Sequence, residues 1–258
     1  MKNLIFVLLF VLSFSSFASG LYKIPVPKNL FNTEFSINTY LQENKKLVTE
    51  EKTTFQKQTE ENGDFLVITS KIKTLDKDGK YFYTTNQANY QLENNKISAY
   101  AQTTKINKEA TPYQDLSLTF DWADKEAIFN KKDYKTDKKT SKTIKLTPKT
   151  MTARGASFYF QNMITNNIKE DKIKMIIPDG NTYGMNIFIS YSPENIKIGD
   201  KNISCYRVDL KPDMGFLSGI IPVMHFWFSI NAPHPFIRYT GLERGPGSPE
   251  IIQEISSL

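Results

Sequence analysis

Apolar and polar residues alternate with a period of two along six stretches of this chain, and that repetition limits the folds open to it. A strand that exposes one face and buries the other produces this pattern. The apolar residues that share a face are Phe35, Ile37 and Leu41; Leu66, Ile68 and Ile72; Ile97, Ala99 and Ala101; Leu116, Leu118, Phe120 and Trp122; Met185, Ile187, Ile189 and Tyr191; and Met224, Phe226, Phe228 and Ile230. The chain is therefore predicted to be mainly β.

Tight-turn sequences separate these strands. They include Asn62-Gly63, Asp78-Gly79, Asn94-Asn95, Asp179-Gly180 and Gly199-Asp200. Asn-Gly and Asp-Gly pairs supply the positive φ angles that short hairpins require. Successive hairpins place consecutive strands side by side and antiparallel, so we expect a meander.

One segment breaks the alternation. In residues 155–167, Phe158, Met163 and Ile164 recur at roughly helical spacing, and two asparagines end the segment. This predicted helix separates a strand set that runs to about residue 150 from a second set at 173–258. A flat sheet of this size would expose one apolar face, so we expect it to curl. The predicted fold is a single domain, residues 19–258: a large curved antiparallel sheet, or half-open β-barrel, wrapped around one or two short helices.

Residues 1–18 have the pattern of a cleavable signal peptide. Lys2 precedes an unbroken apolar run from Leu4 to Leu12, and small residues before Ser19 fit a cleavage site. The run is shorter than the ~20 residues of a membrane-spanning helix. With no cysteine at the cleavage site, no lipid anchor is expected. We predict an exported protein, most simply periplasmic, with release from the cell as the alternative.

Charge restricts the partners. The formal net charge is +6, but the lysines are scattered among acidic residues and threonines, and arginine is scarce. Nucleic-acid binding requires a concentrated basic stripe, so no nucleic-acid partner is expected. Peripheral contact with an anionic membrane surface stays open, because each nearby lysine adds ~1 kcal/mol to such binding. Nothing in the sequence indicates the oligomeric state.

Three stretches together resemble a known pattern. They are FDWADKEAIF at 120–129, ASFYFQNMI followed by IIPDGNTYGMNIFISY, and ENIKIGDKNISCYRVDLKP. Their order resembles a family of uncharacterised exported bacterial half-β-barrel proteins, similar in fold to the periplasmic lipoprotein carriers LolA and LolB. The resemblance implies a concave sheet with a hydrophobic interior, closed by helices, that binds acyl chains or other apolar ligands. The chain departs from LolB in lacking the cysteine that carries a lipid anchor.

The segment 215–236 is the most unusual in composition. Residues 215–228 are nearly all apolar and are interrupted by Pro222. They fit either a buried loop that leads into a core strand or an apolar flap at a cavity or a membrane interface. Trp227 alternates with Phe226 and Phe228, which predicts a strand buried on both faces. The predicted ligand-binding residues, for a hydrophobic cavity or flap, are Phe216, Leu217, Ile220, Ile221, Met224, Phe226, Trp227, Phe228, Trp122 and Phe158.

No residue pattern indicates catalysis. The single cysteine, Cys205, alternates within a strand and is expected to be a buried, inert thiol. His225 and His234 are the only histidines, too few to indicate a metal site. The pair Glu50-Glu51 lies on a strand, where neighbours point to opposite faces, so these carboxylates do not converge. We expect no enzyme activity, no metal and no cofactor.

Two functions fit these observations. The first is an exported envelope protein that binds or carries an apolar ligand, a lipid or a lipidated partner, in the concave face of its sheet. The alternative is a non-catalytic structural or envelope-assembly protein with a filled core and a protein partner. A hydrolase is a third and weaker candidate. An internal void on the order of a few hundred Å³ would favour the carrier.

Overall fold

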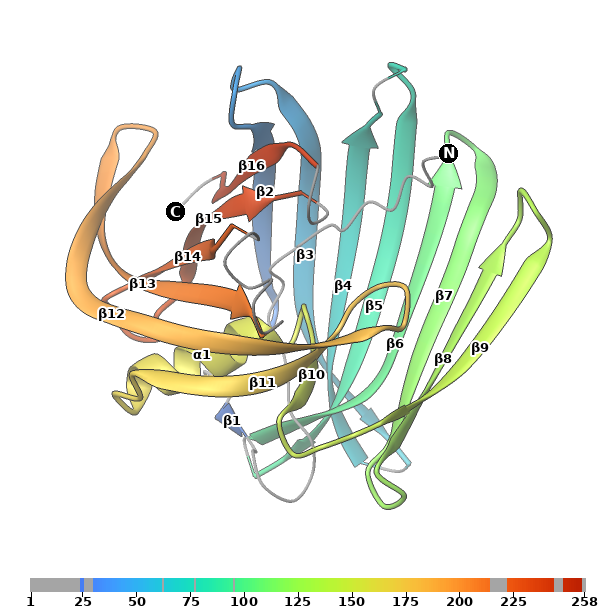
Figure 1. Ribbon diagram of the computed structural model, residues 1–258. Coiled ribbons are helices and arrows are strands. Elements are labelled where there is room, and N and C mark those ends of the chain that lie inside the picture. The colour runs from blue at the N-terminus through green and yellow to red at the C-terminus, as the bar shows by residue number, and fades with distance from the viewer. Residues whose placement is uncertain are drawn as a thin grey trace.

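A computed structural model describes residues 24–25, 30–61, 63–76, 78–94, 96–213, 222–243 and 248–256. These residues form one 16-stranded sheet and one helix, α1 (Ala156–Thr165) (Figure 1). The strands are β1 (Ile24–Pro25), β2 (Thr33–Leu41), β3 (Leu47–Glu60), β4 (Gly63–Leu75), β5 (Tyr81–Glu93), β6 (Lys96–Lys108), β7 (Thr111–Asp121), β8 (Glu126–Asp133), β9 (Lys138–Lys145), β10 (Thr150–Thr152), β11 (Glu170–Ile176), β12 (Thr182–Ile198), β13 (Lys201–Pro212), β14 (Met224–Ser229), β15 (Phe236–Leu242) and β16 (Glu250–Ile255). The mainly β prediction is confirmed.

The sheet consists of two meanders joined in the middle. Strands β2 to β9 follow one another in space, as do β11 to β16. The join is the antiparallel pair of β16 and β2, which places Ile255 opposite Ile37. The short strand β10 pairs in parallel with β11, and β1 pairs with β6 off the main path. Except for the β10–β11 pair, the pairings between described strands are antiparallel, as the hairpin signals predict.

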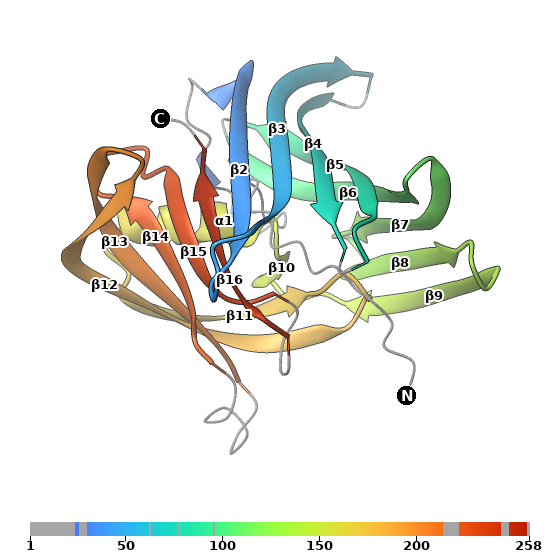
Figure 2. The ribbon, with the colours of Figure 1, turned by 90° about the horizontal axis from the view of Figure 1, so that it is seen from above.

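The sheet curls, and α1 lies on its concave side (Figures 1 and 2). Eight residues of α1 are buried, from Ala156 to Ile164. The ring of Phe160 lies 5.3 Å from that of Phe226 and 6.1 Å from that of Phe228, measured between centroids. The helix predicted at 155–167 is confirmed, with slightly tighter bounds. The helix thus covers the apolar inner face of β14.

The two ends of the sheet approach each other without pairing. In the described strands β9 has only β8 as a ladder partner. Side chains bridge the gap instead: Lys142 Nζ on β9 donates to Asp179 O and to Asn181 Oδ1 in the β11–β12 turn, at 3.0 and 2.8 Å. Lys174 Nζ donates to Lys145 O at 2.9 Å. The barrel is therefore half-open, with its edges held by side-chain contacts.

The predicted signal peptide, residues 1–18, lies outside the described residues. In the part of the chain that the structure describes, no helix has the length and apolarity that a membrane span requires.

Candidate functional site

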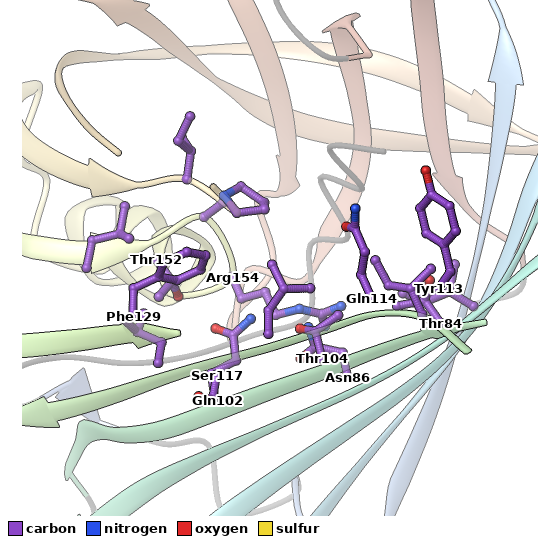
Figure 3. Close-up of a pocket in the computed structure, with 18 of the residues that line it drawn as sticks. Thr84, Asn86, Gln102, Thr104, Tyr113, Gln114, Ser117, Phe129, Thr152 and Arg154 are labelled. Carbon is purple, nitrogen blue, oxygen red and sulfur yellow. The ribbon is translucent and has the colours of Figure 1, made fainter. Parts of the chain in front are cut away.

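A pocket of about 110 Å³ lies on the concave side, beyond the region that α1 fills (Figure 3). Strands β4 to β8 form one wall, and residues 152–154 and 176–178 lie opposite them. The lining residues are Ile72, Phe82, Thr84, Asn86, Gln102, Thr104, Ile106, Tyr113, Gln114, Leu116, Ser117, Leu118, Phe129, Thr152, Ala153, Arg154, Ile176, Ile177 and Pro178. The lining thus combines aliphatic and aromatic side chains with several uncharged polar ones and a single guanidinium.

A row of polar residues crosses four neighbouring strands beside the pocket. Thr53, Ser70, Asn86 and Thr104 stand directly opposite one another on β3, β4, β5 and β6. The hydroxyl oxygens of Thr53 and Ser70 are 2.6 Å apart, and Asn86 Nδ2 donates to Thr104 Oγ1 at 2.7 Å. These four residues form a continuous polar band on the concave face, where other buried polar residues such as Thr84 and Gln114 also lie.

A buried ion pair anchors the band. Arg154 Nη1 lies 3.8 Å from Glu51 Oε1 and donates to Ser70 Oγ at 2.9 Å. Glu51 Oε1 also accepts a hydrogen bond from Thr53 Oγ1, at 2.7 Å. Burial raises the pKa of the Glu51 carboxyl, with Arg154 acting in the opposite direction, and burial lowers the pKa of the Arg154 guanidinium. Both groups are desolvated, so each depends on the other for its charge.

Three buried acceptor oxygens in this region have no hydrogen-bond partner among the described residues. They are Glu51 Oε2, Asn86 Oδ1 and Gln102 Oε1. Asn86 and Gln102 line the pocket, and Arg154 reaches toward their strands (Figure 3). A buried polar atom left without a partner costs about 1–3 kcal/mol. Such atoms beside a pocket mark a place where solvent or a ligand completes the hydrogen bonding.

A second depression, of about 620 Å³, is more open and lies over β6 to β9. Lys105, Lys132 and Lys139 line it, together with Asp115. The Asp115 carboxylate accepts a hydrogen bond from Tyr134 Oη at 2.7 Å. This surface has the character of a solvated strand face, and we place the candidate site in the smaller, more enclosed pocket.

The fully buried members of the predicted ligand-binding set lie in the core around α1. Phe158, Phe226 and Phe228 are at most 1% exposed. Phe226 and Phe228 pack on Phe160 of the helix, and none of the three lines the described pocket. Phe216, Leu217, Ile220 and Ile221 lie outside the described residues. A ligand-binding role for these residues stays a prediction.

The half-buried members of that set, Met224, Trp122 and Trp227, also lie outside the pocket lining. Trp122 stacks on Phe120 and donates from Nε1 to Ala99 O at 2.7 Å. Trp227 lies on the opposite face of β14 from Phe226 and Phe228, as predicted. The prediction that β14 is buried on both faces was wrong, because the Trp227 face is only half-buried and polar.

That outer face carries a hydrogen-bonded network next to the β-bulge in β12. Arg207 donates from Nη1 to Glu194 Oε1 at 2.6 Å and from Nε to Asp209 Oδ1 at 2.9 Å. His225 Nδ1 lies 2.6 Å from Asp209 Oδ1, and Trp227 Nε1 donates to Glu194 Oε2 at 2.7 Å. Partners spread over β12, β13 and β14 tie these strands together.

Cys205 is fully buried, as predicted, and burial raises the pKa of its thiol to about 12. A thiol with so high a pKa carries little thiolate, the reactive form, near neutral pH.

Sequence reasoning missed the polar band, although one signal for it was present. Ser70 lies between Ile68 and Ile72 on a face that alternation marks as buried, so a buried hydroxyl could have been inferred there. Glu51 shares the buried face of β3 with Phe55. No local pattern marks Arg154, which meets these residues only after the chain has folded.

Comparisons with known proteins bear on the fold alone. No family model matches the chain, and no curated protein matches it. The structure is similar to the crystal structure of a β-barrel-like protein of the domain of unknown function DUF1849 from Brucella abortus, with a TM-score of 0.51 and 7% sequence identity. The match covers 88% of this chain and 96% of that one. A β-barrel-like fold is therefore shown, whereas the relation to the LolA and LolB carriers stays a prediction.

Proposed function

We propose that this protein is an exported, non-catalytic binding protein that holds an amphipathic small molecule, or one end of a lipid or lipidated partner, in the pocket between β4 and β8. The observation that carries the proposal is the polar band inside a largely apolar pocket. A purely structural core is most stable when its interior is apolar or fully hydrogen-bonded. Here Asn86 and Gln102 keep unpartnered acceptors at the pocket wall.

The size of the pocket limits the ligand. Binding sites for drug-sized molecules enclose about 300–1,000 Å³, whereas this pocket measures about 110 Å³. A whole diacyl lipid does not fit such a volume. The proposal is therefore restricted to a small amphiphile, or to the terminal part of a larger molecule whose remainder stays outside the pocket.

The alternative is a structural or envelope-assembly protein with a protein partner. The observation in its favour is the region around α1, where eight helix residues are buried and Phe160 packs on Phe226 and Phe228 of β14. The alternative requires the pocket between β4 and β8 to be a minor packing defect rather than a site.

Native mass spectrometry of the chain from Ser19 onward, purified without detergent, tests the proposal. We expect a stoichiometric small-molecule adduct. The adduct should be lost in Leu116→Trp, which fills the pocket from β7. It should persist in Thr119→Trp, the matched control, because Thr119 is exposed on the same strand. A clean apo mass that does not change after incubation with envelope lipids would favour the alternative.

A further inference from the structure

We propose that the pocket selects an amphiphile with an uncharged, hydroxyl-bearing polar end over one with a carboxylate. This inference rests on the proposed function and specifies the ligand class of the same site. It follows from the charge balance at the pocket wall, from the hydrogen-bonding capacity of its side chains, and from the apolar surface beside them.

The charge balance disfavours a charged ligand. Arg154 is the one cationic side chain among the described residues that line the pocket, and the carboxylate of Glu51 lies 3.8 Å from it. Both side chains are at least nine-tenths buried. With both groups ionised the pair carries no net charge, so an incoming carboxylate would lose its hydration and would compete with Glu51 for the same guanidinium. A ligand ammonium would also lose its hydration and would find no free carboxylate, because Glu51 is already paired with Arg154.

The neutral side chains match a hydroxyl group. Asn86 is 5% exposed. Its Oδ1 and the Oε1 of Gln102 are both buried and have no hydrogen-bond partner among the described residues. A carboxamide both donates and accepts, and so does a hydroxyl, whereas a carboxylate only accepts. Thr84 and Thr104 line the same wall and extend this uncharged hydrogen-bonding surface. A hydroxyl can donate to the unpartnered oxygens, and a carboxylate cannot.

Apolar contacts lie next to this polar wall. Ile72 and Phe82 flank it on β4 and β5, Ile106 lies on β6, and Ile177 and Pro178 face them from the β11–β12 turn. A short alkyl chain attached to the hydroxyl carbon can pack on these side chains while the hydroxyl reaches Asn86 and Gln102. The ligand class is therefore an alcohol or a partial glyceride with a short or terminal apolar group.

Isothermal titration calorimetry with three probes of equal chain length tests this class. The probes are octan-1-ol, octanoate and octylammonium at neutral pH, added to the chain from Ser19 onward. We expect octan-1-ol to bind at least tenfold more tightly than either charged probe, the ratio that one net hydrogen bond supplies. Octanoate binding as tightly as octan-1-ol would overturn the ligand class and leave the proposed function intact.

Two variants test whether the polar wall of the pocket causes the preference for the hydroxyl probe. Gln102→Leu removes the carboxamide at similar size and should weaken octan-1-ol binding about tenfold. Thr103→Val, on the exposed face of the same strand, should leave binding unchanged. The three-probe comparison needs no variant, so the ligand class remains testable even if Gln102→Leu does not fold. If none of the probes binds and no adduct is sensitive to Leu116→Trp, the proposed function itself fails.

Discussion

A β-carbon placed on Gly180 would stand 2.5 Å from the ring of Phe129, so the turn between β11 and β12 packs directly onto strand β8. The turn joins the two ends of the curved sheet, and Phe129 also lines the pocket beside Ile177 and Pro178. The closure of the half-barrel and the covering of the pocket are therefore one structural feature.

Substitution of Gly180 tests how much this contact contributes. Gly180→Ala should lower the free energy of unfolding for two reasons: its φ of +76° is unfavourable for a side chain, and the methyl group would overlap Phe129. Gly79 also has a φ of +76° but has nothing within 4 Å of its β-carbon position, so Gly79→Ala is the matched control. We expect a loss of about 1 kcal/mol for Gly79→Ala and a further ~1–3 kcal/mol for Gly180→Ala. Urea unfolding measures both losses. Equal losses would mean that the contact between the Gly180 turn and the Phe129 ring does not contribute to stability.

The Glu51 carboxyl should make stability depend on pH. Burial raises its pKa in the folded protein above the ordinary 4.5. Its contribution to stability is then fully present below pH 4.5 and is lost as the pH rises through the folded-state pKa. The stability of the native protein minus that of Glu51→Gln should therefore fall as the pH rises above 4.5. Glu50→Gln, on the exposed face of the same strand, controls for solvent-exposed charge and should change stability by less than about 0.5 kcal/mol. A difference that rises with pH would contradict the assignment.

Removing one member of the buried Arg154–Glu51 ion pair should lower the free energy of unfolding more than removing both members. Arg154→Met leaves the Glu51 carboxylate without its counter-ion, and breaking a buried pair in this way costs about 3–5 kcal/mol. Because Arg154 holds the pKa of Glu51 down, the substitution should also raise that pKa further. The double variant Glu51→Gln/Arg154→Met should recover part of the lost stability. Chemical denaturation of the three variants forms the cycle, and additive losses would show that the two groups do not interact.

The phenylalanines of β14 should affect folding rather than ligand binding. Phe226→Ala should destabilise the protein by about 3–5 kcal/mol, since Phe226 is fully buried against Phe160 and Tyr239. Phe188→Ala is the control: Phe188 is 46% exposed on β12, and its loss should cost less than about 1 kcal/mol. Thermal unfolding separates the two cases. A folded Phe226→Ala protein with native stability that no longer binds its ligand would instead support the predicted ligand-binding role of Phe226.

The sequence by itself determined the local structure. Alternation located six of the strands, turn sequences such as Asp78-Gly79 located hairpins, and helical spacing around Phe158 located α1. Each of these signals depends on neighbours only a few residues apart. The same alternation placed Ser70 on a buried face, but it did not indicate which residue would hydrogen-bond to the Ser70 hydroxyl.

Only the tertiary structure decided which distant residues meet. Periodicity does not say that β16 pairs with β2, that Gly180 rests on Phe129, or that Arg154 reaches Ser70 from 84 residues away. Nor does it distinguish Phe226, which fills the core, from Ile106, which lines the pocket, because an apolar side chain on the inner face of a strand satisfies the pattern in either place. The curvature of the sheet and the position of α1 fix that difference, since together they set which part of the concave face is filled and which part stays open.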